Sequence, residues 1–214
     1  MKTREGQPEQ PVVCVVGGAW LLPCQSKRRP NTKDIVATPQ YVAHEIVKRF
    51  APAGVCLDPC RGNGVFQKLL PPGALWCELS EGVDFFEFRQ RVDWIVGNPP
   101  YSVFHPWLMH SFTLADEIVY LIPLHKIFSG AKYLDAIADF GGIKAILHIG
   151  SATILPGFPV GFAIGAVHFS RGFKGDTRIG NLWAAGVDFP LQNPSPAEKG
   201  HNAKLCRKAE GDAP

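Results

Sequence analysis

The Asn-Pro-Pro-Tyr motif at residues 98–101 is the most specific chemical pattern in the sequence. It follows the apolar run 93–97, and its two prolines fix φ and supply no N–H, so the neighbouring carbonyl groups are rigid at a strand's end. The Asn98 side-chain oxygen and the Pro99 carbonyl can each accept one N–H of an amino group, and Tyr101 can stack on a flat ring. An ordinary turn uses the same residue types, but the position after a strand favours a site for an amine.

A glycine-rich turn at residues 57–64, Leu-Asp-Pro-Cys-Arg-Gly-Asn-Gly, is the second pattern. Gly62 and Gly64 leave the backbone unshielded, so a ligand can approach it closely. The turn has neither the G-x-G-x-x-G nor the G-x-x-x-x-G-K-S/T fingerprint, which disfavours NAD and ATP. Asp58 suits a cationic amino-acid group better than a pyrophosphate, so we expect a cofactor that carries such a group.

Three residues further along the chain extend this expected cofactor site. Glu78 follows about twenty residues later at the end of the next strand, where an acid can accept hydrogen bonds from both ribose hydroxyls. Asp84 can accept an adenine amino group, and Phe85 can lie beside its ring. Taken singly, the acids fit solvated loops and Phe85 fits the core. Their order favours the cofactor site.

The elements that must position these residues follow from the alternation of apolar runs and turn residues. A helix begins after Pro39 and is ended by Pro52 and Gly54. Strands and helices then alternate, which indicates parallel β-α units in a doubly wound sheet. We expect strands at 55–58, 74–78, 92–97 and 117–122, and helices at 65–70, 104–115 and 127–140. Runs 143–149 and 162–169 have no helix between them, so they predict an antiparallel pair.

Length and composition indicate one globular domain with tails. The chain has 214 residues, 46% hydrophobic and 19% charged, enough for one α/β core. We expect a partly ordered arm at 1–34, the folded domain at 35–191 and a polar, disordered tail at 192–214. The apolar stretch 12–22 is too short to span a bilayer and follows an acidic segment unlike a signal peptide, so we expect no membrane partner.

The cysteines and histidines indicate reduced thiols and no metal site. The six cysteines lack paired C-x-x-C spacing, and a chain of this size needs no disulfide framework, which favours a cytoplasmic protein. The histidines show no ligand spacing with acids or thiols; those considered are His105, His110, His125 and His148.

The basic residues are compatible both with nucleic-acid binding and with an ordinary solvated surface. The net charge of +3 permits binding of nucleic acid without requiring it. Both the cluster 27–29 and the residues Arg171, Lys174 and Arg178 fit phosphate contacts and fit a solvated surface equally well. The loop 155–162, rich in glycine and aromatic residues, fits either the border of a substrate pocket or a hairpin turn.

Between residues 38 and 169 the chain resembles the gamma-type amino-group methyltransferases, typified by N6-adenine DNA methyltransferases. Thr38-Pro39 is similar to motif X of that family, the turn 58–64 to motif I and Glu78 to motif II. Asp84-Phe85 is similar to motif III, and residues 98–101 match motif IV. The order of the motifs is that of the gamma group.

The resemblance implies a Rossmann-like class I fold, S-adenosylmethionine as cofactor and a flipped adenine as acceptor. It assigns the acceptor to Asn98, Pro99, Pro100 and Tyr101. It assigns the cofactor to Thr38, Pro39, Asp58, Pro59, Cys60, Gly62, Gly64, Glu78, Asp84, Phe85 and Asn98.

Several alternatives stay open at this stage. After Phe169 only a short basic stretch and a polar tail follow, unlike family members with a large target-recognition region. Either site-specific or relaxed recognition is compatible with this, the latter as in compact phage- or prophage-encoded enzymes. The same motif serves adenine in RNA, cytosine N4 and protein glutamine, and a nucleic-acid-binding module without turnover is a further alternative. The target site and the oligomeric state are not determined.

Overall fold

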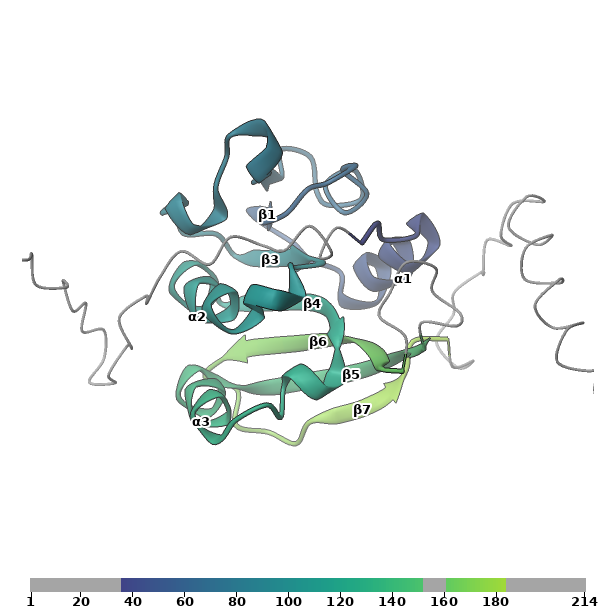
Figure 1. The fold of residues 1–214 in the computed structure, drawn as a ribbon, viewed down its shortest axis with the longest axis vertical. Helices are drawn as coiled ribbons and strands as arrows, with labels where there is room; N and C mark the ends of the chain where they lie inside the picture. The colour runs from purple at the N-terminus through teal and green to yellow at the C-terminus, as the bar shows by residue number, and fades with distance from the viewer. Residues whose placement is uncertain (1–35, 152–160, 184–214) are drawn as a thin grey trace, which may run out of the picture.

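A seven-stranded mixed sheet forms the centre of the protein (Figure 1). The computed structural model describes residues 36–151 and 161–183, so the expectations for the arm, the cluster 27–29, most of the loop 155–162 and the tail lie outside the described residues. The strands are β1 (Cys56–Asp58), β2 (Leu75–Trp76), β3 (Trp94–Gly97), β4 (Glu117–Pro123), β5 (Gly141–Ser151), β6 (Ala163–Arg171) and β7 (Arg178–Asn181). Their order across the sheet is β2-β1-β3-β4-β6-β5-β7.

The first four strands form the parallel part of the sheet. β1 pairs in parallel with β2 on one side and with β3 on the other, and β3 pairs in parallel with β4. The chain therefore reverses its direction of travel across the sheet between β1 and β3. In open α/β sheets the carboxyl ends of the strands at such a reversal border the ligand crevice. The glycine turn follows β1 and Asn98 follows β3, so both lie at this crevice.

The antiparallel pair predicted from the sequence is confirmed, with one strand added. β6 lies between β4 and β5 and is antiparallel to both. The edge strand β7 pairs in parallel with β5 and was not predicted. Its residues are mostly exposed and include Gly180, so neither apolar alternation nor β-propensity marks it as a strand. Its pairing with β5 creates the strand.

Three helices flank the sheet: α1 (Gln40–Phe50), α2 (Phe104–Leu114) and α3 (Ala131–Phe140). Figure 1 shows α2 and α3 on one side of the sheet and α1 on the other. The Pro39 carbonyl accepts from the amides of Val42 and Ala43, which begins α1 after a proline as expected. Within the described residues, no helix combines the length and the apolar character needed to cross a bilayer.

Two helix predictions need correction. Residues 65–70 form successive turns rather than a helix, although the Lys68 amide reaches the Gly64 carbonyl. A segment of six residues followed by two prolines cannot offset the cost of helix nucleation. The helix predicted over 127–140 begins only at Ala131, because Gly130 precedes it in an extended conformation (φ 171°). Short 3-10 helices link the remaining elements: η2 (Leu79–Glu81), η3 (Phe85–Glu87), η4 (Tyr101–Val103) and η5 (Leu124–Lys126).

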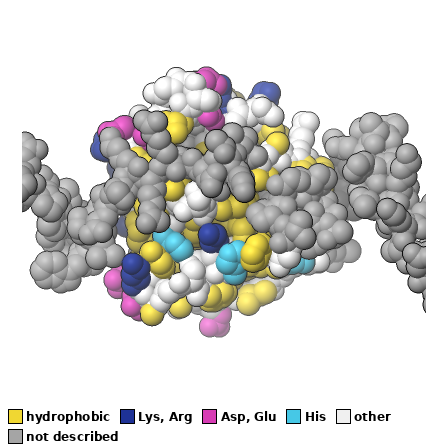
Figure 2. Space-filling view, viewed as in Figure 1, with side chains coloured by type: hydrophobic (Ala, Val, Ile, Leu, Met, Phe, Trp, Pro, Cys, Tyr) yellow, Lys and Arg dark blue, Asp and Glu magenta, His cyan; other side chains and the backbone are white. Residues whose placement is uncertain are grey.

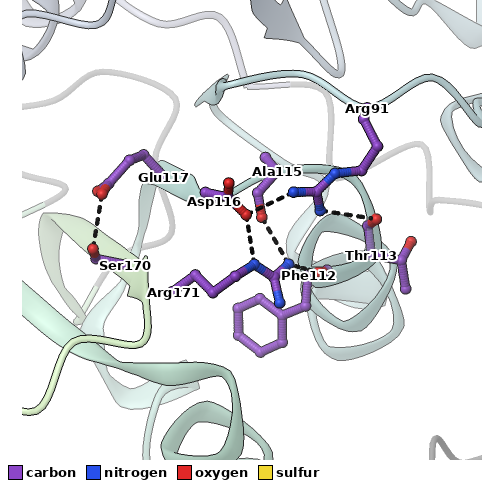
Figure 3. A network of polar contacts seen from close by, with 8 residues as sticks. All are labelled: Arg91, Phe112, Thr113, Ala115, Asp116, Glu117, Ser170 and Arg171. Carbon is purple, nitrogen blue, oxygen red and sulfur yellow. Dashed lines mark hydrogen bonds and ion pairs between the residues drawn. The ribbon is translucent and has the colours of Figure 1, made fainter. Parts of the chain in front are cut away.

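An arginine–aspartate network closes the amino edge of the parallel strands (Figure 3). Asp116 Oδ1 accepts from Arg91 Nη2 at 2.7 Å and from Arg171 Nε at 2.5 Å. Arg171 also donates to the carbonyls of Phe112 and Ala115, which are left without helical partners at the end of α2. The network therefore ties the end of α2, the start of β4 and the end of β6.

We expect the Arg171→Leu variant to lower the free energy of unfolding by about 1–2 kcal/mol, because α2 loses the donors for two carbonyls while the apolar stem is kept. Urea unfolding of the full chain measures this difference. The matched control is Arg178→Leu, on the exposed edge strand β7. Equal effects of the two substitutions would contradict a role for the network in stability.

Candidate active site

A cleft at the carboxyl ends of β1 and β3 brings together three segments that are far apart in the sequence. It encloses about 360 Å³, part of it open to solvent. Its lining comes from the segment before α1, from the glycine turn and from the end of β3. The residues are Val36, Ala37, Thr38, Cys60, Arg61, Gly62, Asn63, Val65, Phe66 and Asn98. Parts of the predicted motifs X, I and IV therefore meet in one place.

The glycine turn exposes its backbone to this cleft. Gly62 and Gly64 have φ values of 49° and 74°, a left-handed conformation that favours glycine. A Cβ built on Gly62 would have no atom within 4 Å, so the space beside this residue is open. The Asp58 carboxylate stabilises the turn from inside by accepting from the amides of Cys60 (3.3 Å) and Gln67 (3.1 Å).

Asp58 is only 1% exposed and does not line the cleft. Burial raises its pKa to about 7, and the two amide hydrogen bonds only partly oppose this shift. The close approach of β3 explains part of the burial. A Cβ on Gly97 would lie 3.0 Å from Pro59 Cδ and 3.3 Å from Asp58 Oδ1, so a larger residue here would require the turn to move by a few tenths of an ångström.

Glu78 lies at the rim of the cleft with most of its hydrogen-bonding capacity in use. Oε2 accepts from the Gly62 amide at 2.8 Å, and Oε1 accepts from the amide and the hydroxyl of Ser80. Burial raises the pKa of Glu78, but the bonds from Ser80 and Gly62 and the charge of Arg61 outweigh it and lower the pKa. A carboxylate has about four acceptor positions. One remains, so binding two hydroxyls requires the Ser80 hydroxyl to rotate away.

Asn98 is held by its amide nitrogen and leaves its side-chain oxygen unpaired. Nδ2 donates to the Val36 carbonyl at 3.1 Å and to Thr38 Oγ1 at 3.2 Å. A carbonyl can only accept, so the bond to Val36 determines which way the amide group faces. Within the described residues, the buried Oδ1 has no hydrogen-bond donor. An unsatisfied buried acceptor costs about 1–3 kcal/mol, which a ligand that donates an N–H recovers.

Cys60 links the glycine turn to the Asn-Pro-Pro-Tyr motif. Its Sγ donates to the Asn98 backbone carbonyl at 2.9 Å. Burial raises the pKa of the Cys60 thiol well above its usual value, so the thiol remains protonated and can act as a donor. The sequence motif includes Cys60 but contains no signal for this bond. The contribution of the Val36 carbonyl was missed as well, because a backbone group is invisible in the residue pattern.

The structure places several predicted site residues outside the cleft. Phe85 is buried against Trp107 of α2, with ring centroids 4.4 Å apart. This packing agrees with the alternative interpretation of Phe85 as a core residue. Asp84 caps η3 by accepting from the Phe86 amide at 2.9 Å. Tyr101 is buried in η4. These aromatic rings pack with other apolar groups because exposing them to water is unfavourable.

The prolines of the predicted site act on the backbone. Pro39 precedes α1, Pro59 packs against Gly97, and Pro100 begins η4. Pro99 is buried between Asn98 and Pro100. Across residues 36–151 and 161–183, no group of three His, Cys, Asp or Glu side chains is arranged to hold a metal ion.

Comparison with known proteins identifies the fold. No family model matches the chain, and no curated protein matches it. A candidate class I S-adenosylmethionine-dependent methyltransferase from Listeria monocytogenes aligns with a TM-score of 0.52 at 12% identity, covering 86% of this chain and 74% of that one. A type I restriction-modification methyltransferase subunit from Streptococcus thermophilus aligns with a TM-score of 0.54 at 14% identity, covering 83% of this chain and 54% of that one.

These alignments confirm the fold class predicted from the sequence. The sheet, with its parallel strands and one antiparallel strand between β4 and β5, is that of the Rossmann-like class I methyltransferases. This chain spans about half the length of the Streptococcus subunit. At identities of 12% and 14%, these alignments show a shared fold, and the reaction must be inferred from the residues of the site.

The pKa of Asp58 predicts how stability depends on pH. Its folded-state pKa of about 7 lies above the ordinary value of 3.8, so the folded protein binds more protons than the unfolded chain between these values. The contribution of this group to stability is therefore present below about pH 4 and is lost as the pH rises to about 7, by an amount on the order of a few kcal/mol.

Urea unfolding of the wild type and the Asp58→Asn variant at several pH values isolates this effect. We expect the difference in unfolding free energy, wild type minus variant, to decrease from pH 4 to pH 7 and then to level off. A constant difference over this range would show that Asp58 ionises normally in the folded protein, and an increase would show that its folded-state pKa is lowered; either would contradict the raised pKa.

Proposed function

We propose that the protein is an S-adenosylmethionine-dependent methyltransferase that methylates the exocyclic N6 amino group of adenine in DNA. The observation that carries the proposal is the buried Oδ1 of Asn98 at the cleft, which has no hydrogen-bond donor among the described residues. An amino group is the donor that this oxygen lacks. The fold, which resembles those of a candidate methyltransferase and a restriction-modification methyltransferase subunit, is compatible with methyl transfer.

The cleft fits S-adenosylmethionine in three respects. The open backbone at Gly62 permits close approach of the cofactor, and the Glu78 carboxylate keeps one acceptor position for a ribose hydroxyl. Asp58 lies just behind the turn, where a positive charge on the cofactor favours its ionised form. The bound cofactor supplies a methyl group on a positively charged sulfur. The predicted contacts of Asp84 and Phe85 with its adenine ring remain predictions.

Asn98 contributes by positioning the acceptor. The lone pair of an adenine amino group is delocalised into the ring, so the nitrogen is a weak nucleophile. Acceptance of its two N–H groups by Asn98 Oδ1 and the Pro99 carbonyl turns the lone pair towards the methyl group. Once methylated, the nitrogen would lose a proton to solvent, so Asn98 and Pro99 need only hold and orient the amino group. No strong base is required.

The amide of Asn98 must be rigid for this purpose. Val36 and Thr38 hold its nitrogen, and Cys60 holds its backbone carbonyl. A base within a duplex cannot bring its amino group into a buried pocket of this kind, so the target adenine must be flipped out of the stack. The flipped base is proposed to lie beside residues 98–101.

DNA adenine is preferred over the other amino acceptors because of the resemblance in the glycine turn. The Asp58-Pro59 pair and the order of the motifs are similar to DNA-modifying members of the gamma group. Adenine in RNA, cytosine N4 and protein glutamine offer the same amino chemistry to Asn98. A binding module without turnover is disfavoured, because it has no need for a buried unpaired acceptor.

The Asn98→Ala variant tests the proposed chemistry. We expect N6-methyladenine formation to fall by about 100-fold or more, since the amino group loses its positioning acceptor. Transfer from labelled S-adenosylmethionine to DNA, RNA and protein, followed by nucleoside and amino-acid analysis, measures it. The control variant is Gln90→Ala, which truncates an exposed amide. Equal N6-methyladenine signals from wild type and Asn98→Ala would refute the assignment. Label found in RNA or protein instead of DNA would identify that molecule as the acceptor.

Cofactor binding is tested separately with Glu78→Gln. Loss of a charged acceptor at the ribose position should weaken S-adenosylmethionine about 10- to 100-fold. Because the pKa of Glu78 is lowered, the group is ionised throughout the neutral range and the effect should not depend on pH there. Calorimetry measures the affinity, with the exposed Glu87→Gln as control. Unchanged affinity in Glu78→Gln would place the ribose elsewhere.

A further inference from the structure

Exposed aromatic rings gather at the carboxyl edge of the sheet, outside the cleft. Phe128 is 66% exposed and Phe162 is 42% exposed. The rings of His125 and Phe162 contact each other with centroids 4.3 Å apart. The Phe128 amide donates to the His125 carbonyl, so these residues belong to one local structure. We call His125, Lys126, Phe128 and Phe162 the edge surface. Phenylalanine side chains are usually buried, so exposed ones that contact another ring indicate a surface suited to binding a ligand.

The edge surface lies at the same edge of the sheet as Asn98. β4 runs parallel to β3 with Gly97 opposite Tyr120, and Pro123 at its end pairs with Ile164 of β6. His125 and Lys126 follow the end of β4, and Phe162 precedes β6. The edge surface therefore lies at the carboxyl end of β4, the strand next to β3.

Hydrogen bonds connect the edge surface to the segment that follows the Asn-Pro-Pro-Tyr motif. His105 Nε2, in the first turn of α2, lies 3.1 Å from the Lys126 carbonyl and 2.6 Å from Ser129 Oγ. The His105 ring also stacks on Tyr133 with centroids 3.6 Å apart. The edge surface is thus attached to the same α2 that begins directly after residues 98–103.

Two lysines lie close to these rings. Lys126 belongs to the edge surface, and Lys132 Nζ lies 4.9 Å from the centre of the Tyr133 ring. Burial and the nearby Lys126 lower the pKa of His125, so its ring is uncharged at neutral pH. Figure 2 shows histidine, lysine or arginine and hydrophobic side chains next to one another on the face towards the viewer.

Aromatic rings combined with lysines are the arrangement that binds single-stranded nucleic acid. Bases stack on the rings, and cations attract the phosphates. A duplex hides the faces of its bases and offers little for such rings to contact. A glutamine side chain of a protein substrate has no flat ring to stack.

We propose that the edge surface binds an unpaired nucleotide next to the target base, so that the preferred acceptor is single-stranded nucleic acid. This inference rests on the proposed function and narrows its substrate class. His125 and Phe162 supply the stacking face, and Lys126 contacts the adjoining phosphate. The base held there keeps the neighbouring adenine directed towards Asn98.

Binding of a fluorescent, adenine-containing single strand to the full-length protein tests the proposal. We expect Phe162→Leu and His125→Ala each to weaken binding about tenfold by fluorescence anisotropy, since each removes a stacking ring. Phe162→Trp should retain binding, because it keeps a ring. The matched control is Ile179→Ala, which truncates a 76% exposed apolar side chain on the edge strand β7. Unchanged S-adenosylmethionine affinity and unfolding curves in each variant establish that it is folded.

Three outcomes overturn the proposal. Equal single-strand affinities for wild type and Phe162→Leu would do so, as would a loss in Phe162→Trp equal to that in Phe162→Leu. Tighter binding of the matching duplex than of the single strand would do so as well. A protein that binds the single strand through these rings but transfers no methyl group supports the edge surface and refutes the proposed function, so the two failures are distinguishable. Parallel DNA and RNA strands identify which sugar is preferred.

Discussion

The close approach of β3 to the glycine turn after β1 is the constraint on which the site depends. Gly97 permits this contact, since even a Cβ there would press closely on Pro59 and Asp58. The approach brings Cys60 Sγ within 2.9 Å of the Asn98 carbonyl and places the Asn98 side chain within reach of Thr38. The proposed cofactor site at the turn and the proposed acceptor site at Asn98 are therefore held at a fixed separation, which is what the proposed direct transfer requires.

The same region contains groups that are unfavourable in the free protein. Asp58 is buried with a raised pKa, and Asn98 Oδ1 lacks a donor within the described residues. Such groups persist only where the surroundings are stable enough to offset them. The apolar core around β3 and β4 and the arginine–aspartate network at the opposite edge supply that stability. Ligands that donate an N–H or carry a positive charge relieve these costs, which makes the site selective for them.

The strand β4 connects this chemistry to the edge surface. It is buried along most of its length, lies between β3 and β6, and extends beyond the end of β3 to Pro123. Residues after its carboxyl end, together with the start of β6, form an aromatic and positively charged surface beside the cleft. The parallel pairing of β4 with β3 and its antiparallel pairing with β6 thus bring His125 and Phe162 to the same edge of the sheet as Asn98, although α2 and more lie between them in the sequence.

The sequence by itself determined the alternation of strands and helices, the antiparallel pair, and the position of Gly62 and Asn98 at strand ends, because apolar periodicity and turn residues are local signals. It left open whether Phe85 is ligand or core, and it did not mark β7 or the turns at 65–70. Only the tertiary structure shows that Phe85 packs against Trp107 and that β7 pairs with β5, since both contacts depend on distant residues. The bonds from Asn98 to Val36 and Thr38 join residues about sixty positions apart. No local pattern encodes such contacts, because they exist only once the sheet has assembled.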